Sequence, residues 1–164
     1  MPTETPTLEA VLLRYGASLA RIARTYEATP AGREDLMQDV ALALIRALPR
    51  WRGDSALGTF VYRVATNVAI DRIARRPPEA LDLASIADRP DPAPTPESAH
   101  ADGDARERLA RAVRGLPLNL RQVMSLVLEG LTHGEIAAVL DLTENNVAVR
   151  ANRARAQLKK TLEA

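Results

Sequence analysis

The sequence lacks cysteine, has no long apolar run and contains only five aromatic residues. Without cysteine the chain has no disulfides, thiolate metal sites or thiol nucleophiles. No apolar run approaches the roughly 20 residues that cross a bilayer, and the first residues do not have the basic-then-apolar pattern of a secretion signal. We therefore expect a cytoplasmic chain that does not insert into a membrane.

Lysine is also scarce, since it occurs only at Lys159 and Lys160, and arginine supplies nearly all the positive charge. Residues 11–76 hold eleven arginines against six acids, and residues 106–164 hold ten basic residues against six acids. Residues 77–105 hold seven acids against one arginine. The net charge of +1 thus conceals two basic segments, each suited to a polyanion, on either side of an acidic one.

The stretch from Thr132 to Leu162 has the pattern of a helix-turn-helix. Thr132 and Glu135 form a capping box that begins a short helix, and its apolar face is Ile136, Ala137 and Leu140. Asp141-Leu142 breaks this helix, and Thr143 can cap the next one.

The second helix of this stretch has one apolar side and one polar, basic side. Its apolar positions recur at steps of three and four, at Val147, Ala151, Ala154, Leu158 and Leu162. The other side carries Asn145, Asn146, Val149, Arg150, Asn152 and Arg153. Amides and guanidiniums read base edges in the major groove, so the pattern indicates DNA binding. The alternative is a basic, solvated helix at the end of a bundle.

Three helices are expected in the N-terminal part, at about residues 8–26, 33–48 and 59–76. The third has a polar stripe at steps of four, Arg63, Asn67, Asp71 and Arg75, and follows a loop with two glycines. Trp51, Phe60 and Tyr62 fall in the same span. Arginine with aromatic rings suits single-stranded DNA, because bases stack on the rings. The alternative is that the rings fill the core between helices.

The chain therefore divides into two helical modules, residues 8–76 and 106–164, joined by a linker at residues 77–105 that is rich in proline and acid. The linker could serve as a solvated tether or cover a basic channel. Nothing alternates with the period of a strand. We predict an all-α fold with two small helical modules.

Both modules together resemble the extracytoplasmic function (ECF) sigma factors of bacterial RNA polymerase, which keep only regions two and four. EDLMQDVALALIRAL is similar to the helix that docks on the polymerase clamp, and WRGDSALGTFVYRVATNVAIDRIARR to the loop and helix that melt and read the minus-ten element. LPLNLRQVMSLVLEGLTHGEIAAVLDLTENNVAVRANRARAQLK is similar to the module that binds the minus-35 element. The order and spacing of these segments make the resemblance specific.

The resemblance implies a role for each surface. The residues that would contact the polymerase clamp are Asp35, Gln38 and Asp39. A pocket for a base flipped out of the nontemplate strand falls on the loop from Arg52 to Thr59, including Gly53, Asp54, Ser55 and Ala56. Asn67 would lie near the melted bases, and phosphates would be held by Arg63, Arg72, Arg75 and Arg76. At the minus-35 element, the resemblance implies that Asn146, Val149, Arg150 and Arg153 read bases. It implies that Arg155, Lys159 and Lys160 hold phosphates.

The sequence departs from the family pattern at four positions. Phe60 stands where tryptophan is frequent, and Asp141 replaces the usual turn glycine. In the recognition helix, Ala148 stands where a basic residue is common and Asn152 where a bulkier side chain is frequent. We expect the residues at positions 148 and 152 to affect which minus-35 sequence the chain prefers.

The function implied is an alternative sigma factor that binds core RNA polymerase and promoter DNA, is restrained by an anti-sigma factor, and has no catalytic activity or cofactor. One alternative is a conventional helix-turn-helix regulator that acts without joining the polymerase, but it leaves the stripe on residues 59–76 without a task. Another is a metal-dependent enzyme using Glu34, Asp35 and Asp39. The two histidines, His100 and His133, are far from that cluster in sequence, and no phosphate-binding glycine loop, nucleophile elbow or metal motif occurs.

Overall fold

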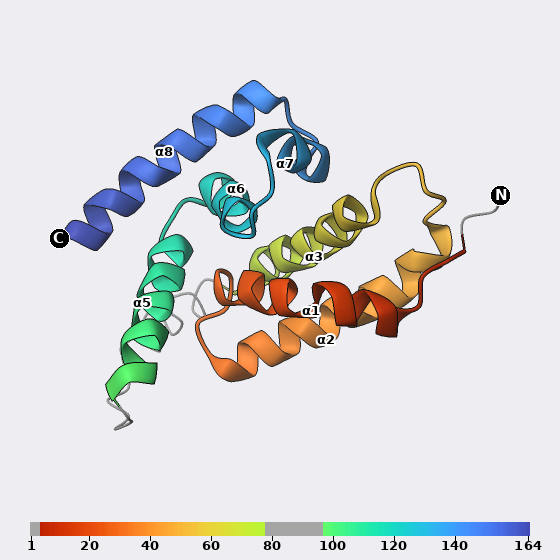
Figure 1. Cartoon of the computed structure of the whole chain (residues 1–164), viewed down its shortest axis with the longest axis horizontal. Coiled ribbons are helices and arrows are strands. Elements are labelled where there is room, and N and C mark those ends of the chain that lie inside the picture. Colours follow the sequence, from red (N-terminus) through yellow and green to blue (C-terminus); the bar gives the residue numbers. More distant parts are fainter. Residues whose placement is uncertain (1–3, 78–96) are drawn as a thin grey trace.

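The N-terminal part of the chain is a bundle of three helices. The computed structural model describes residues 4–77 and 97–164, with the side chains of the second range described from residue 103. Helices α1 (Leu8–Arg24), α2 (Pro30–Ala47) and α3 (Leu57–Ala74) pack against one another, and a 3-10 turn, η1 (Leu48–Arg50), leads out of α2 (Figure 1). Their apolar faces meet in a core that includes Leu19, Leu36, Leu44 and Val61.

Helix α2 begins three residues earlier than the sequence predicted. Thr29 caps it by accepting a hydrogen bond from the Gly32 amide at 3.0 Å, and Pro30 occupies the first helical position. Proline is favoured there, because its missing N–H would have had no partner within the helix and its φ is already helical. The residues that separate the two predicted helices therefore include the start of α2.

The C-terminal part consists of four helices, α5 (Glu97–Arg114), α6 (Leu118–Leu128), α7 (His133–Leu140) and α8 (Glu144–Glu163). Helix α5 was expected to begin near Arg106, but it begins directly after the last proline of the predicted linker. Residues 97–105 include three alanines and a glutamate, which are good helix formers, beside serine, histidine, two aspartates and a glycine, which are weaker ones. Residues 78–96, most of the predicted linker, lie outside the described ranges.

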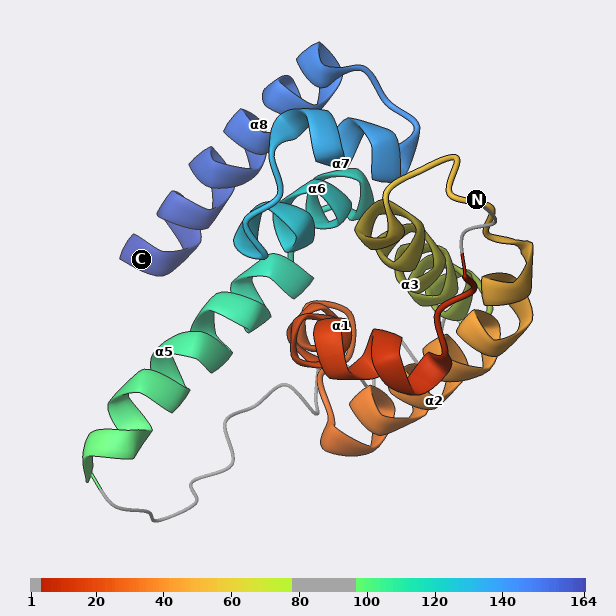
Figure 2. The same cartoon turned by 45° about the vertical axis from the view of Figure 1, so that its right-hand side comes forward.

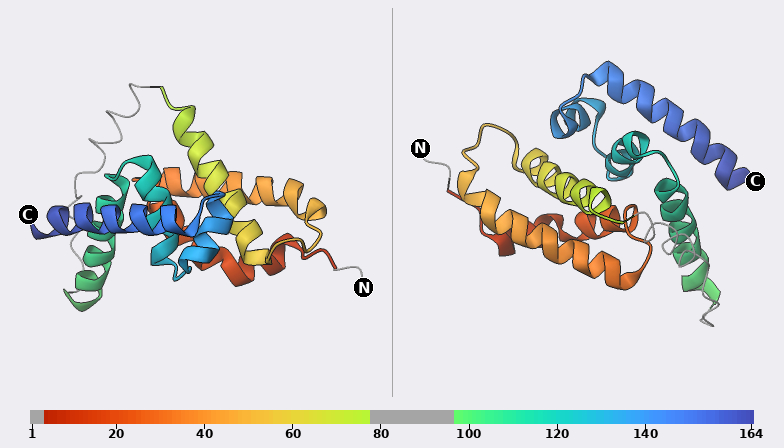
Figure 3. Two further views of the ribbon diagram at one scale, coloured as in Figure 1. Left: turned by 90° about the horizontal axis from the view of Figure 1, so that it is seen from above. Right: turned by 180° about the vertical axis from the view of Figure 1, so that it is seen from behind.

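The two groups of helices pack against each other. Helix α7 lies against α3, and α6 lies near α1, while α8 runs along the outer side away from the N-terminal helices (Figures 1 and 2). Views from above and behind show the same arrangement (Figure 3). Buried residues from both groups, among them Ile22 and Leu126, belong to one continuous cluster. A second cluster, containing Val113, Leu120 and Leu158, joins α5, α6 and α8.

Every element in residues 4–77 and 97–164 is helical, so the predicted all-α class is confirmed. Within those ranges, no helix combines the length and apolar character needed to cross a bilayer.

Candidate nucleic-acid interface

The loop before α3 is shaped by one side chain at its start. The ring N–H of Trp51 donates to the Ser55 carbonyl at 3.1 Å and so closes the loop on itself. Gly53 has φ = 80°, a left-handed conformation that side chains disfavour. Arg52, Gly53, Asp54 and Ala56 are exposed, and Ser55 is half-buried. The loop is therefore closed by this hydrogen bond and exposed to solvent at the position where the flipped-base pocket was predicted.

Helix α3 separates a buried face from an exposed polar stripe. Val61, Ala65, Thr66 and Ala69 are buried. The predicted stripe is exposed along its whole length, at Arg63, Asn67, Asp71 and Arg75. At the first residue of the stripe, the Arg63 guanidinium donates hydrogen bonds to two carbonyls at the C-terminal end of α7. These are the carbonyls of Ala138, at 2.5 Å, and Val139, at 3.5 Å.

The aromatic residues of this region are partly buried and either pack against the core or hold the loop. Tyr62 and Phe60 are partly buried against the core, and the Tyr62 ring meets Tyr15 edge-on with centroids 5.8 Å apart. Trp51 is half-buried and holds the loop. Packing, the second interpretation of this aromatic cluster, accounts for these contacts.

A buried acid that no sequence pattern pointed to pairs with two arginines at the end of α3. Glu27, 6% exposed, lies just after α1 and pairs with both Arg72, at 3.4 Å, and Arg76. Arg72 also bonds Asp39 at 2.7 Å. Burial lowers the pKa of the Arg72 guanidinium, but the hydrogen bonds and negative charges of Asp39 and Glu27 outweigh it and raise the pKa overall. The two arginines are thus held in place by ion pairs.

The outer face of α2 is half acidic and half apolar. Asp35 and Gln38 are exposed, whereas Asp39 is half-buried and paired with Arg72. Further along the same face, Leu42 and Ile45 are 53% and 52% exposed. Exposed positions at 35, 38, 42 and 45 follow the helical repeat and form one stripe, the α2 stripe. Contiguous exposed apolar side chains beside polar ones are typical of a protein-binding surface.

The described residues bring together no group of three histidine, aspartate or glutamate side chains that could hold a metal ion. In the cluster considered for an enzyme, the Asp39 carboxylate is paired with Arg72 at 2.7 Å.

The helix-turn-helix forms with the caps that the sequence predicted. Thr132 accepts from the Glu135 amide at 3.1 Å, and the Glu135 carboxylate accepts from the Thr132 amide at 2.8 Å, so the capping box is confirmed. Thr143 caps α8 by accepting from the Asn146 amide at 3.1 Å. Between them Asp141 takes a left-handed conformation, with φ = 55° and ψ = 50°, which allows α7 to end there.

Helix α8 presents the predicted polar face to solvent. Val147, Ala151, Ala154 and Leu158 are buried as expected, but Leu162, predicted on the same side, is 49% exposed in the last turn of the helix. The predicted DNA-contacting side chains are exposed, apart from half-buried Arg150: Asn146, Val149, Arg153, Arg155, Lys159 and Lys160.

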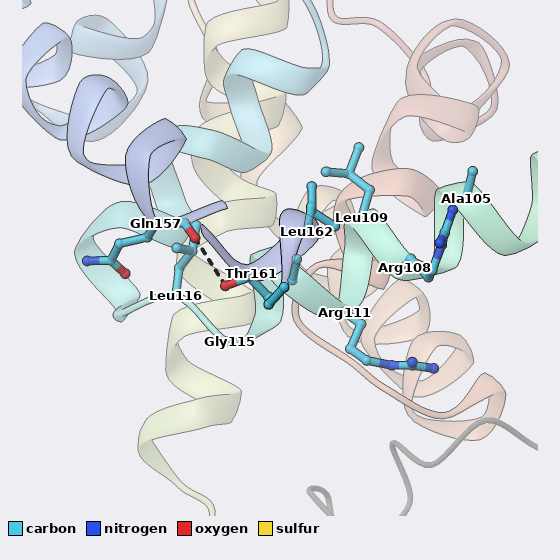
Figure 4. Close-up of a pocket in the computed structure, with 11 residues that line it drawn as sticks. Ala105, Arg108, Leu109, Arg111, Gly115, Leu116, Gln157, Thr161 and Leu162 are labelled. Atoms are coloured by element: carbon cyan, nitrogen blue, oxygen red, sulfur yellow. Dashed lines mark hydrogen bonds between the residues drawn. The ribbon is translucent and has the colours of Figure 1, made fainter. Parts of the chain in front are cut away.

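A cavity of about 600 Å³ lies between α5 and the end of α8 (Figure 4). Its lining includes Leu109, Leu116 and Leu162, with Arg108 and Arg111 among the polar residues. Its lining side chains include no acid and no histidine, and none of the predicted site residues reaches it.

Residues 11–78 match the protein family described as Sigma-70 region 2, and residues 106–158 match the family described as Sigma-70, region 4. The chain is 32% identical over 156 residues to the ECF RNA polymerase sigma-E factor of Escherichia coli K12, a match that covers 88% of this chain and 81% of that protein. It is also 32% identical over 140 residues to the RNA polymerase sigma-H factor of Pseudomonas aeruginosa, covering 79% and 72% respectively.

Two solved structures have the same fold. CnrH, determined in complex with the cytosolic domain of CnrY, is 26% identical, with a TM-score of 0.68 over 95% of this chain and 87% of that one. The sigma factor RpoE of Bartonella quintana, determined with the anti-sigma factor NepR, is 18% identical, with a TM-score of 0.71 over 95% and 96%.

Proposed function

Because this chain belongs to the extracytoplasmic function family of RNA polymerase sigma factors, we propose that it binds core polymerase and directs initiation at promoters with two elements. The observation that carries the proposal is the exposed stripe of α3 beside a closed, glycine-containing loop. A duplex-binding regulator needs only the helix-turn-helix, whereas single-stranded DNA needs a shaped surface of this kind.

At the minus-ten element, the loop from Arg52 to Thr59 receives a flipped base, and Asn67 reads the melted strand. Flipping a base costs a few kcal/mol, which a shaped pocket must offset. The guanidiniums of Arg63, Arg72, Arg75 and Arg76 hold the phosphates. Glu27 pairs with both Arg72 and Arg76 and so fixes where these two guanidiniums lie.

At the minus-35 element, α8 lies in the major groove. Asn146, Val149, Arg150 and Arg153 read bases, and Arg155, Lys159 and Lys160 hold phosphates; all but Arg150 are exposed. The α2 stripe contacts the polymerase clamp, with Asp35, Gln38 and Asp39 at its polar end and Leu42 and Ile45 at its apolar end. We place region two at residues 8–76 and region four at residues 106–164.

The chain acts in the cytoplasm, where the polymerase and the promoter are, and contributes no catalytic step of its own. Because CnrH and RpoE were each solved with a partner, and NepR is an anti-sigma factor, we further propose that a protein of that kind restrains this chain.

Promoter selection tests the function. Core polymerase is mixed with the purified chain and a library of random upstream sequences, and run-off transcripts are sequenced. We expect transcripts that begin downstream of two shared elements and that require the chain. Absence of any transcript with folded protein, together with tight duplex binding as a dimer without polymerase, would instead favour a conventional regulator.

A further inference from the structure

We propose that Val149, at the centre of the exposed face of α8, selects a thymine in the minus-35 element by contact with the C5-methyl group of that base. The inference rests on the proposed function and deepens it, because it names the base and the chemical group that one side chain of the recognition helix contacts. It also predicts where this thymine lies relative to the base that Arg153 contacts.

Val149 is a large apolar side chain that the fold leaves in solvent. It is 39% exposed, whereas the apolar residues on the opposite side of α8 are buried: Val147, Ala151, Ala154 and Leu158. Helix α8 runs along the outer side of the molecule, and its main packing partners are α5, α6 and α7 (Figures 1 and 2). Burial in the core therefore does not explain why a valine stands at this position.

Helix stability does not explain the valine either. Valine is a weaker helix former than alanine, lysine or arginine, because its branched side chain loses χ1 freedom against the preceding turn. Position 149 lies in the second turn of α8, where any of these three residues would favour the helix more. A single exposed apolar residue is common on protein surfaces, so the argument depends on which residues surround it.

The residues one helical turn away from Val149 are all polar and exposed. Positions three and four residues away in either direction are neighbours on the surface of a helix. Here they are Asn145, Asn146, Asn152 and Arg153. Val149 thus lies in the middle of a patch of amides and a guanidinium, and this patch is the part of α8 proposed to face the major groove.

An apolar side chain in the middle of such a patch favours one group of the bases. Every base edge in the major groove presents hydrogen-bond donors or acceptors, and the apolar group among them is the C5-methyl of thymine. Valine cannot hydrogen-bond, so a polar edge group that meets it loses water without compensation. Contact with the thymine methyl instead buries apolar surface on both sides. The single preferred χ1 rotamer of valine in a helix holds its methyl groups in place before DNA binds.

The geometry of the helix places this thymine close to the base that Arg153 contacts. Val149 and Arg153 are four residues apart, which is about 6 Å along the axis at 1.5 Å per residue. Base pairs of a duplex are stacked about 3.4 Å apart. The two contacted base pairs are therefore one or two steps apart. Because arginine pairs best with O6 and N7 of guanine, we expect a guanine within about two base pairs of the thymine.

Removing one methyl group from the DNA tests the contact. Core polymerase carrying this chain is bound to a promoter obtained by selection, and each thymine of the minus-35 element, on either strand, is replaced in turn by deoxyuridine, which lacks only the C5-methyl. We expect one thymine whose replacement weakens promoter affinity about three- to fivefold, the size expected for one buried methyl group.

The converse substitution puts the methyl group on a different base. At the sensitive position, cytosine and 5-methylcytosine are compared, each paired with guanine. We expect 5-methylcytosine to bind about three- to fivefold tighter than cytosine, because the methyl group again meets Val149. A methyl effect of the same size on two bases shows that the methyl group itself is contacted, since the neighbouring polar group differs between them.

Val149→Ala assigns the methyl effect to this side chain. The variant removes both γ-methyl groups at an exposed position, and alanine favours the helix, so the fold should be kept. We expect polymerase carrying Val149→Ala to bind the thymine and deoxyuridine promoters equally. Leu162→Ala is the matched control, because Leu162 is 49% exposed on the same helix and lies outside the predicted DNA contacts. It should keep the full methyl effect.

Arg153→Ala marks the neighbouring base pair. Polymerase carrying this variant should no longer distinguish one guanine of the element from the other bases. The position of that guanine relative to the sensitive thymine then checks the spacing of one or two base pairs.

Four results would overturn the inference. They are a minus-35 element in which no deoxyuridine weakens binding, a methyl effect that persists in Val149→Ala, one that disappears in Leu162→Ala, and a sensitive thymine more than two base pairs from the guanine that Arg153→Ala ignores. Any of them leaves the proposed function intact, because the promoter is still selected and bound. If selection yields no shared upstream element at all, the proposed function fails and the role of Val149 fails with it.

Discussion

Asn67 and Arg153 occupy equivalent positions on the two predicted DNA surfaces. Each is exposed, Asn67 on the stripe of α3 and Arg153 on the outer face of α8, so neither supports the core. Their substitution therefore tests function without confounding stability.

Asn67→Ala should reduce promoter opening about tenfold while duplex binding changes less than twofold. Arg153→Ala should weaken minus-35 recognition about tenfold, because a base-reading contact contributes about 1–3 kcal/mol and 1.4 kcal/mol is a factor of ten. Open-complex yield and duplex affinity are measured for both. Equal effects of both variants on both elements would contradict this division.

Tyr26 is a buried phenol whose ionisation is expected to make stability depend on pH. Its burial raises the pKa of the phenol to about 12 from 10.0, against an opposing effect of the Arg121 charge. Since the folded pKa is the higher one, the stabilisation is complete below pH 10 and is lost as pH rises through 12. A shift of that size corresponds to about 3 kcal/mol.

We therefore expect Tyr26→Phe to remove a phenolate absorbance step near pH 12 and to lose less stability than the unaltered chain between pH 10 and 12. A step near pH 10 that disappears with the variant would show that Tyr26 is accessible to water.

Among the elements, the helix-turn-helix depends on a residue with an unusual backbone. Asp141 is left-handed, and it is the only non-glycine residue in the described ranges with positive φ. A left-handed residue with a Cβ costs roughly 1–2 kcal/mol, which aspartate lessens through local hydrogen bonding. We expect Asp141→Gly to be more stable than Asp141→Ala by about 1 kcal/mol in urea unfolding. Equal stabilities would mean that α7 ends differently.

The α2 stripe is the element expected to contact polymerase. Leu42 and Ile45 are about half exposed, so changing both to glutamate should leave the melting temperature nearly unchanged. Affinity for core polymerase should fall at least tenfold, as for central interface residues. Leu13→Glu is the matched control, because Leu13 on α1 is 83% exposed. A similar loss for Leu13→Glu would indicate a nonspecific charge effect.

Across the whole molecule, features set by residues three or four positions apart could be predicted from the sequence. Contacts between residues far apart in the sequence could not. The capping box at Thr132 and Glu135 and the exposed stripe on α3 follow from spacings of three and four residues. The predicted start of α2 at residue 33 is three residues late, because a proline fits the first position of a helix as well as a break between helices.

Contacts between the modules had no signal in the sequence. Glu129 is 108 residues from Arg21, and Glu27 is 45 residues from Arg72, so no periodicity connects them. The predicted roles of the site residues came from the family resemblance, and the structure adds which of them are exposed and which, like Arg63, are already bonded.

The most direct test of the account is promoter opening itself. On a promoter obtained by selection, permanganate modifies only unpaired thymines, so it reports melting of the minus-ten element. We predict modified thymines there only when both core polymerase and this chain are present, and many fewer with Asn67→Ala. Thymines that remain unmodified with both proteins bound, or that are modified equally by core polymerase alone, would contradict the claim that this chain opens promoters.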